Sequence, residues 1–158
     1  MTKSQRGFSL IELLIVVAII GIIAAIAIPN LLASRRAANE GSAQSSLRTI
    51  HSCEMTYQSS TGRGEFGTIP DLRGDFLTDE ILGSGSKSGY NFVATPSEPG
   101  VIPATYYTTA VPIITDGAGR TGTRRFGVAE DGVIHGDSLA LTPYSDGDAV
   151  KAAPAVGN

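Results

Sequence analysis

Apolar side chains are concentrated near the beginning of the chain. Between Leu13 and Ile28 no residue carries a polar side chain, and the apolar segment counted from Phe8 holds 21 residues with only Ser9 and Glu12 as polar interruptions. A helix of that length spans about 31 Å, close to the thickness of a bilayer's hydrocarbon core. The pattern therefore predicts a membrane-spanning helix over residues 8–29, with the basic residues Lys3 and Arg6 on the cytoplasmic side.

The period of the apolar positions changes after residue 30. Ala43, Leu47, Ile50 and Tyr57 recur at helical spacing, with Arg, Ser and Gln between them. This predicts an amphipathic helix over residues 30–59 that packs its apolar face on whatever follows. Pro29 and Gly21 loosen or bend the helix, and an ordinary helix end at Pro29 is the alternative interpretation.

Residues 60–158 are rich in Gly, Pro, Ser and Thr, and they contain short runs with β-propensity. Asp131-Gly132 predicts a hairpin turn between the last two runs. We expect an α+β fold, in which the amphipathic helix packs on an antiparallel sheet of three or four strands. A short helix is expected over Leu77–Leu82, and Ser138–Asn158 is expected to be a surface loop or partly disordered. The predicted strands are Tyr90–Thr95, Thr105–Val111, Arg124–Val128 and Val133–His135.

Three ordinary interpretations of the apolar segment leave Glu12 unexplained. A cleaved secretory signal would place its small-residue site, Ala25-Ile26-Ala27, inside the apolar run. A buried helix needs a larger protein around it, and a simple anchor needs no carboxylate. Transfer of an unpaired carboxylate from water into hydrocarbon costs several kcal/mol of free energy. No Lys or Arg lies between Gly7 and Ile28 to pair with it.

An α-amino group supplies the missing positive charge if the chain is cut between Gly7 and Phe8. The new ammonium would then lie four residues from Glu12. Within one chain the two charges partly neutralise each other. Between neighbouring chains they would form an ion pair that sets the axial register.

The residues Arg6-Gly7-Phe8-Ser9-Leu10-Ile11-Glu12-Leu13-Leu14, with the apolar run and Pro29-Asn30, resemble the prepilin-type signal of type IV pilins and type II secretion pseudopilins. The resemblance covers roughly residues 3–32. It implies a seven-residue leader (1–7), a membrane prepilin peptidase that cuts after Gly7, N-methylation of Phe8 and an assembly role for Glu12. It also implies that the helix melts or kinks near Gly21 and Pro29, while Gly21 and Ala25 allow close helix approach.

The function implied is a structural subunit of a type IV pilus, a homo-oligomeric filament held together by its apolar helices, rather than an enzyme. Its partners would be the peptidase and the inner-membrane assembly machinery. The subunit would wait in the inner membrane before joining a cell-surface filament. A pseudopilin in a periplasmic piston is the first alternative. A membrane-anchored periplasmic enzyme or binding module is the second.

Composition limits other chemistry. Cys53 is the single cysteine, which excludes an internal disulfide; an interchain disulfide is the alternative to a buried thiol. His51 and His135 lie far apart in the sequence, and we expect no cofactor or metal. Removing residues 1–7 leaves 151 residues with 10 basic and 15 acidic side chains, a net charge of −5. This argues against general nucleic-acid binding. Asp137, Asp146 and Asp148 could form a calcium site, but a solvated turn is the favoured interpretation. The basic pairs Arg35-Arg36 and Arg124-Arg125 could contact nucleic acid, but solvated or interchain ion pairs are favoured.

Overall fold

The computed structural model describes residues 7–138 and 142–156. The chain divides after Ser34 into two compact units. The first contains the beginning of helix α1 (Leu10–Ser59), which continues through Pro29, so the alternative of a helix end there is wrong. Its large apolar side chains are exposed, from Phe8 to Leu31. This part of α1 is long and apolar enough to cross a membrane, and none of it is buried.

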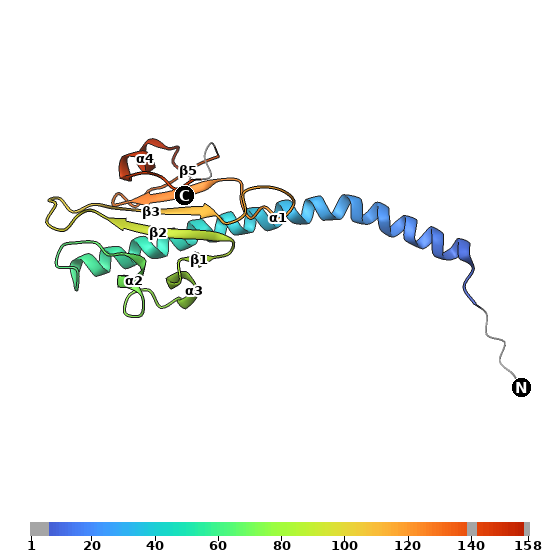
Figure 1. Ribbon diagram of the computed structural model, residues 1–158, viewed down its shortest axis with the longest axis horizontal. Helices are drawn as coiled ribbons and strands as arrows, with labels where there is room; N and C mark the ends of the chain where they lie inside the picture. The colour runs from blue at the N-terminus through green and yellow to red at the C-terminus, as the bar shows by residue number, and fades with distance from the viewer. Residues whose placement is uncertain (1–6, 139–141, 157–158) are drawn as a thin grey trace, which may run out of the picture. The chain divides into compact units, whose positions relative to one another are not determined.

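The second unit is built on an antiparallel sheet with strand order β1-β2-β3-β4-β5 (Figure 1). The predicted α+β class is therefore confirmed, and the four predicted strands lie within two residues of their observed bounds. The first strand was not predicted, because two residues are too few to show an alternating pattern. The strands are β1 (Ser86–Lys87), β2 (Tyr90–Pro96), β3 (Tyr106–Pro112), β4 (Arg125–Ala129) and β5 (Ile134–Asp137).

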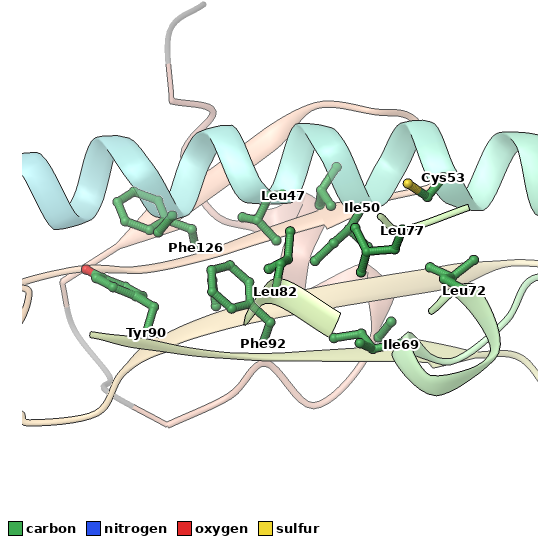
Figure 2. Packing of buried hydrophobic residues seen from close by; sticks show 14 of the residues in the cluster. Leu47, Ile50, Cys53, Ile69, Leu72, Leu77, Leu82, Tyr90, Phe92 and Phe126 are labelled. Carbon is green, nitrogen blue, oxygen red and sulfur yellow. The ribbon is translucent and has the colours of Figure 1, made fainter. Parts of the chain in front are cut away.

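The core lies between the sheet and the C-terminal part of α1. Register places Phe92 opposite Ala110, and Ala110 opposite Phe126, so these three side chains share one face of the sheet. Leu47 and Ile50 of α1 are fully buried in the same cluster, as Figure 2 shows. Burying side chains of this size contributes about 1.5–3 kcal/mol each. The predicted amphipathic face of the helix is thus the face that binds the sheet.

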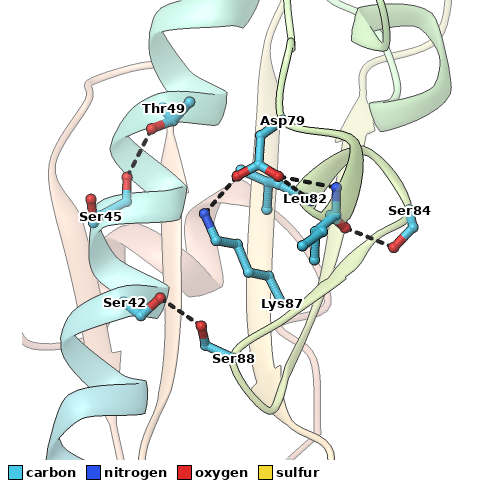
Figure 3. Close-up of polar contacts among 9 residues, drawn as sticks. Ser42, Ser45, Thr49, Asp79, Leu82, Ser84, Lys87 and Ser88 are labelled. Atoms are coloured by element: carbon cyan, nitrogen blue, oxygen red, sulfur yellow. Dashed lines mark hydrogen bonds and ion pairs between the residues drawn. The ribbon is translucent and has the colours of Figure 1, made fainter.

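Short elements connect α1 to the sheet. Helix α3 (Glu80–Gly83) corresponds to the helix predicted over Leu77–Leu82 and begins later, because Asp79 caps it. A second one-turn helix, α2 (Ile69–Leu72), was not predicted. Asp79 accepts hydrogen bonds from Ile81 and Leu82 and also binds Lys87 of β1 (Figure 3). In the same view, the Ser42 hydroxyl of α1 donates to the Ser88 hydroxyl over 2.9 Å.

The prediction of a surface loop or partly disordered segment over Ser138–Asn158 is wrong for the part that folds into helix α4 (Gly147–Ala152). Tyr144 and Val150 are buried against the face of the sheet opposite α1, the side on which Figure 1 shows α4. Residues 139–141, 157 and 158 lie outside the described residues. Gly127 makes this packing possible, because a Cβ atom there would lie 3.0 Å from Val150 and 3.1 Å from Tyr144. The Val156 amide then donates to the Ile134 carbonyl along the outer edge of β5.

Candidate assembly site at the start of helix α1

Ser9 and Glu12 cap the first turn of α1 reciprocally. The Glu12 Oε2 atom accepts a hydrogen bond of 2.8 Å from the Ser9 amide, and the Ser9 hydroxyl accepts one of 3.3 Å from the Ile11 amide. Helix N-termini leave several amides without intrahelical partners, so both contacts stabilise the start of the helix. The carboxylate also lies where the helix dipole favours negative charge.

The capping role of Ser9 was not recognised in the sequence, although its signal is present. Ser9-Leu10-Ile11-Glu12 matches the pattern in which Ser or Thr precedes Glu by three residues. A carboxylate has room for about four hydrogen bonds, and the contact with Ser9 uses one. Glu12 is exposed, so its second oxygen can accept a charged partner while the cap remains intact.

Gly7 and Phe8 lie immediately before this capped turn, outside α1. Both are exposed, and the Phe8 side chain has an exposed fraction of 90%. The bond between them is therefore accessible, and Phe8 lies four residues before Glu12 in the chain. Residues 1–6 of the predicted leader lie outside the described residues.

Gly21, Ala25 and Pro29 follow in α1 and do not join the Glu12 site. All three are exposed and have helical backbone. Gly21 and Ala25 are one turn apart and lie on one side of the helix, which leaves a shallow surface there. Their roles in close packing and in bending remain predictions.

Two acidic residues on the core-facing side of α1 were overlooked. The positions 40, 43, 47, 50, 54 and 57 form a continuous stripe with alternating spacings of three and four, so Glu40 and Glu54 face the sheet. Glu40 Oε1 accepts hydrogen bonds from the Thr123 amide (2.7 Å) and hydroxyl (2.6 Å), and Oε2 binds Arg124. Burial alone would raise the pKa of Glu40, but these hydrogen bonds outweigh it and lower the pKa.

Glu54 has a less complete set of partners. It is fully buried, and its Oε2 accepts a hydrogen bond of 2.9 Å from the Gly67 amide. Its Oε1 atom has no hydrogen-bond partner among the described residues. Desolvation raises the pKa of this carboxyl to about 7, and the nearby charge of Asp71 adds to the effect.

The histidine and cysteine candidates take part in structural contacts. His51 lies against the Tyr106 hydroxyl, and His135 Nδ1 contacts the Ala153 carbonyl at 2.7 Å. The buried Cys53 thiol donates to the Phe76 carbonyl. Within residues 7–138 and 142–156, no group of three His, Cys, Asp or Glu side chains is arranged to hold a metal ion.

The three aspartates considered for calcium have separate local contacts. Asp137 binds Arg125 through both carboxylate oxygens, Asp146 caps α4, and Asp148 lies 4.0 Å from Lys151. The basic pair Arg124-Arg125 is likewise divided, since Arg124 binds Glu40 and Arg125 binds Asp137.

Comparison with known families identifies the N-terminal segment. Residues 2–28 match the family described as the prokaryotic N-terminal methylation motif. The chain begins with a prepilin-type methylation motif. The matched segment contains Gly7, Phe8 and Glu12, and the resemblance predicted from the sequence is confirmed.

Homologues of this prepilin-type chain include pilins and a secretion protein. The type IV major pilin protein PilA of Myxococcus xanthus is 41% identical over 72 residues, which cover 42% of this chain and 33% of that protein. The type IV wide pilus major component PilA4 of Thermus thermophilus is 63% identical over 38 residues, 24% of this chain and 29% of that protein. The type II secretion system core protein G of Escherichia coli is 33% identical over 57 residues, 36% and 39% of the two chains.

The similarity to each relative covers less than half of this chain. The matches span about a third of the length of these relatives. No solved structure matches the chain. The family match therefore identifies residues 2–28, whereas the contacts of the second unit, which we call the head (residues 35–158), come from this chain's own residues.

Proposed function

We propose that this protein is the structural subunit of a type IV pilus, assembled through its apolar N-terminal helix. The observation that carries the proposal is the exposed apolar surface of α1 between Phe8 and Leu31. A surface of roughly 1,500 Å² of apolar atoms corresponds to tens of kcal/mol in water. It therefore has to lie in lipid or against other helices at every stage.

Assembly exchanges one apolar environment for another. In the bilayer, lipid tails cover the helix; in the filament, helices of neighbouring subunits cover it. Because lipid is as apolar as the helices, this exchange provides little hydrophobic driving force, and specific contacts decide whether it occurs. A heterologous contact that repeats with a rotation and a rise produces an open filament.

Glu12 and Phe8 are the residues that we assign to that specific contact. Cleavage by a prepilin peptidase between Gly7 and Phe8 creates an ammonium group, which N-methylation keeps positively charged. Glu12 remains anchored by Ser9 and presents its free oxygen to the Phe8 ammonium of a neighbour. A pair of opposite charges in an apolar core is strong because little solvent screens it. Gly21, Ala25 and Pro29 would allow neighbouring helices to approach and bend.

Location and partners follow from this role. The subunit would lie in the inner membrane until the pilus assembly machinery extracts it, and then form part of a cell-surface filament. Its role would be structural rather than catalytic.

A pseudopilin of a type II secretion system is the alternative, and the similarity to core protein G favours it. Such a filament would stay in the periplasm.

Intact mass and the N-terminal peptide test the proposal. We expect a mature chain of 151 residues, 158 less the leader of seven, beginning with N-methylated Phe8. Negative-stain microscopy should show surface filaments that disappear when the gene is deleted. Filaments confined to the periplasm would favour the pseudopilin, and an uncleaved, solitary chain would contradict both assignments.

A further inference from the structure

The loop between β3 and β4 is fastened to the first turn of helix in the second unit. The Asn39 side chain donates a hydrogen bond of 2.9 Å to the Thr121 carbonyl. The fit is close, since a Cβ atom at Gly89 would lie 2.7 Å from Thr121 and 3.3 Å from Asn39. Ile114 belongs to the same connection, because its carbonyl accepts a hydrogen bond of 3.0 Å from the Thr121 amide.

Basic side chains gather around this connection. Arg36 lies one turn before Asn39 and Glu40, on the same side of the helix, and Arg35 precedes it. Arg120 adjoins Thr121 in the loop. Glu40 does not neutralise these three arginines, because it binds Thr123 and Arg124. Between Ile113 and Arg124 the loop contains one acidic residue, the exposed Asp116.

Two isoleucines in the same loop are exposed. Ile113 and Ile114 have exposed fractions of 48% and 47%. We call the five residues Arg35, Arg36, Ile113, Ile114 and Arg120 the basic–apolar patch. Apolar side chains beside arginines are typical of protein surfaces that rest at the boundary between lipid headgroups and acyl chains.

We infer that the basic–apolar patch docks on the anionic bilayer surface while the subunit is still in the membrane. This inference rests on the proposed function, because it requires the predicted membrane-spanning segment, residues 8–29, to lie in the bilayer. Arg35 follows that segment by six residues, about 9 Å of helix, which places it near the lipid phosphates. Arginines bind phosphate oxygens through paired N–H groups, and Ile113 and Ile114 would enter the interface beside them.

Charge complementarity identifies anionic lipid as the partner. The mature chain carries a net charge of −5, whereas the patch holds three positive charges. The acidic remainder of the head is repelled by anionic lipid, so the patch is the part of the head that such a membrane attracts. Docking there would hold the head in one orientation before assembly.

The experiment uses the full chain reconstituted in vesicles, with a fluorescent probe at Ile114→Cys in a Cys53→Ala background. One vesicle is phosphatidylcholine alone, and the other contains about a third phosphatidylglycerol, chosen for its negative surface potential. We expect an NBD label to shift to the blue and to be quenched by doxyl lipids in the anionic vesicles. Both signals should weaken as salt rises, since salt screens exposed charges.

Charge reversal supplies the decisive comparison. Arg35→Glu together with Arg36→Glu should abolish the shift in anionic vesicles. Arg48→Glu together with Arg73→Glu changes the net charge equally at exposed positions outside the patch and should preserve it. Equal emission of the probe in both kinds of vesicle would overturn the inference, and so would a blue shift that persists in the Arg35→Glu, Arg36→Glu variant. A shift that grows with the protein-to-lipid ratio would also overturn it, because it would indicate that a second copy of the chain covers the probe. Each of these results is compatible with normal filaments, so the proposed function is judged separately by microscopy.

Discussion

Glu40 of helix α1 holds Thr123 through two short hydrogen bonds, one from the amide and one from the hydroxyl, although 83 residues separate them in the chain. With the Arg124 contact, Glu40 fastens the start of β4 to the helix at the end of the head where α1 enters it. Hydrogen bonds to a charged group are worth about 1.5–3 kcal/mol each, and removal of one partner leaves the others unsatisfied.

Glu40→Ala should therefore lower the free energy of unfolding of the head by about 2–3 kcal/mol. Urea denaturation of the full chain in detergent, followed by circular dichroism, measures the change. Because the folded pKa of Glu40 is lowered, its contribution is present above the unfolded pKa and is lost as the pH falls through the folded pKa. Glu98→Ala, at an exposed loop position, is the control and should change stability by less than about 0.5 kcal/mol. Equal effects of the two variants would refute this account of Glu40.

Glu54 should act in the opposite direction with pH. Its folded pKa is about 7 against an ordinary value of 4.5, so the folded state holds the proton more tightly. The stability from this group is complete below pH 4.5 and is lost as the pH rises toward 7, a loss on the order of 3 kcal/mol. Glu54→Gln is neutral throughout and can still accept the Gly67 amide.

Melting temperatures at pH 5, 6, 7 and 8 test this prediction. The wild type should melt progressively lower over this range than Glu54→Gln does, and the variant should be the more stable at pH 8. Glu98→Gln, which removes an exposed carboxylate, should keep the wild-type profile. A pH profile that is unchanged by Glu54→Gln would show that this carboxyl is ionised in the folded protein at all these values.

Gly127 should determine whether the C-terminal segment packs on the sheet. In Gly127→Ala the new methyl group would press on Val150 and Tyr144 at 3.0–3.1 Å. Overpacking of this kind typically lowers the free energy of unfolding by roughly 1–3 kcal/mol. We expect the short helix α4 to detach from the sheet before the strands separate. Hydrogen exchange should accelerate in residues 144–156 while β2 and β3 stay protected. Gly119→Ala is the control, since nothing lies within 4 Å of its Cβ position. Unchanged exchange at Val150 would contradict the prediction.

The sequence was sufficient to predict elements whose signal is local. The stripe of Ala43, Leu47 and Ile50 predicted the buried face of α1, and short runs rich in β-branched and aromatic residues predicted β2 to β5. Residues 142–156 were misjudged because their composition has low complexity and their apolar positions follow no clear helical or strand period. Their packing depends on the missing side chain of Gly127, a relation between positions 23 residues apart that no local pattern records.

The acidic residues of α1 show the same limit. Their spacing puts Glu40 and Glu54 on the core-facing side of the helix, but a search for apolar positions omits them because they are polar. The backbone amides that bind them belong to other segments and are not visible in the pattern of the helix. Ser9 differs, since its capping pattern with Glu12 is entirely local and was open to prediction. The proposed partner of Glu12 belongs to another chain of the filament, so the pair of charges would form only when subunits assemble.

Ser9 and Glu12 together allow helix capping and intermolecular pairing to be separated. Glu12→Gln keeps an oxygen that can accept the Ser9 amide, because Gln serves as well as Glu in this cap, but it removes the negative charge. We predict that this variant is processed and inserted in the membrane but forms at least about tenfold fewer filaments, equivalent to losing ~1.4 kcal/mol per contact. Glu12→Ala, which loses both the helix cap and the negative charge, should form no more filaments than Glu12→Gln.

Ser9→Ala is the matched variant, because it weakens the cap and preserves the charge of Glu12. Loss of a capping side chain typically costs about 1 kcal/mol of helix stability, which the surrounding lipid or filament partly offsets by favouring helix. Filament counts by microscopy and processed subunit by immunoblot should therefore stay near wild type for Ser9→Ala and fall for Glu12→Gln. Abundant normal filaments from Glu12→Gln would show that the charge is dispensable. A defect confined to Ser9→Ala would make helix capping, rather than ion pairing, the function of this turn.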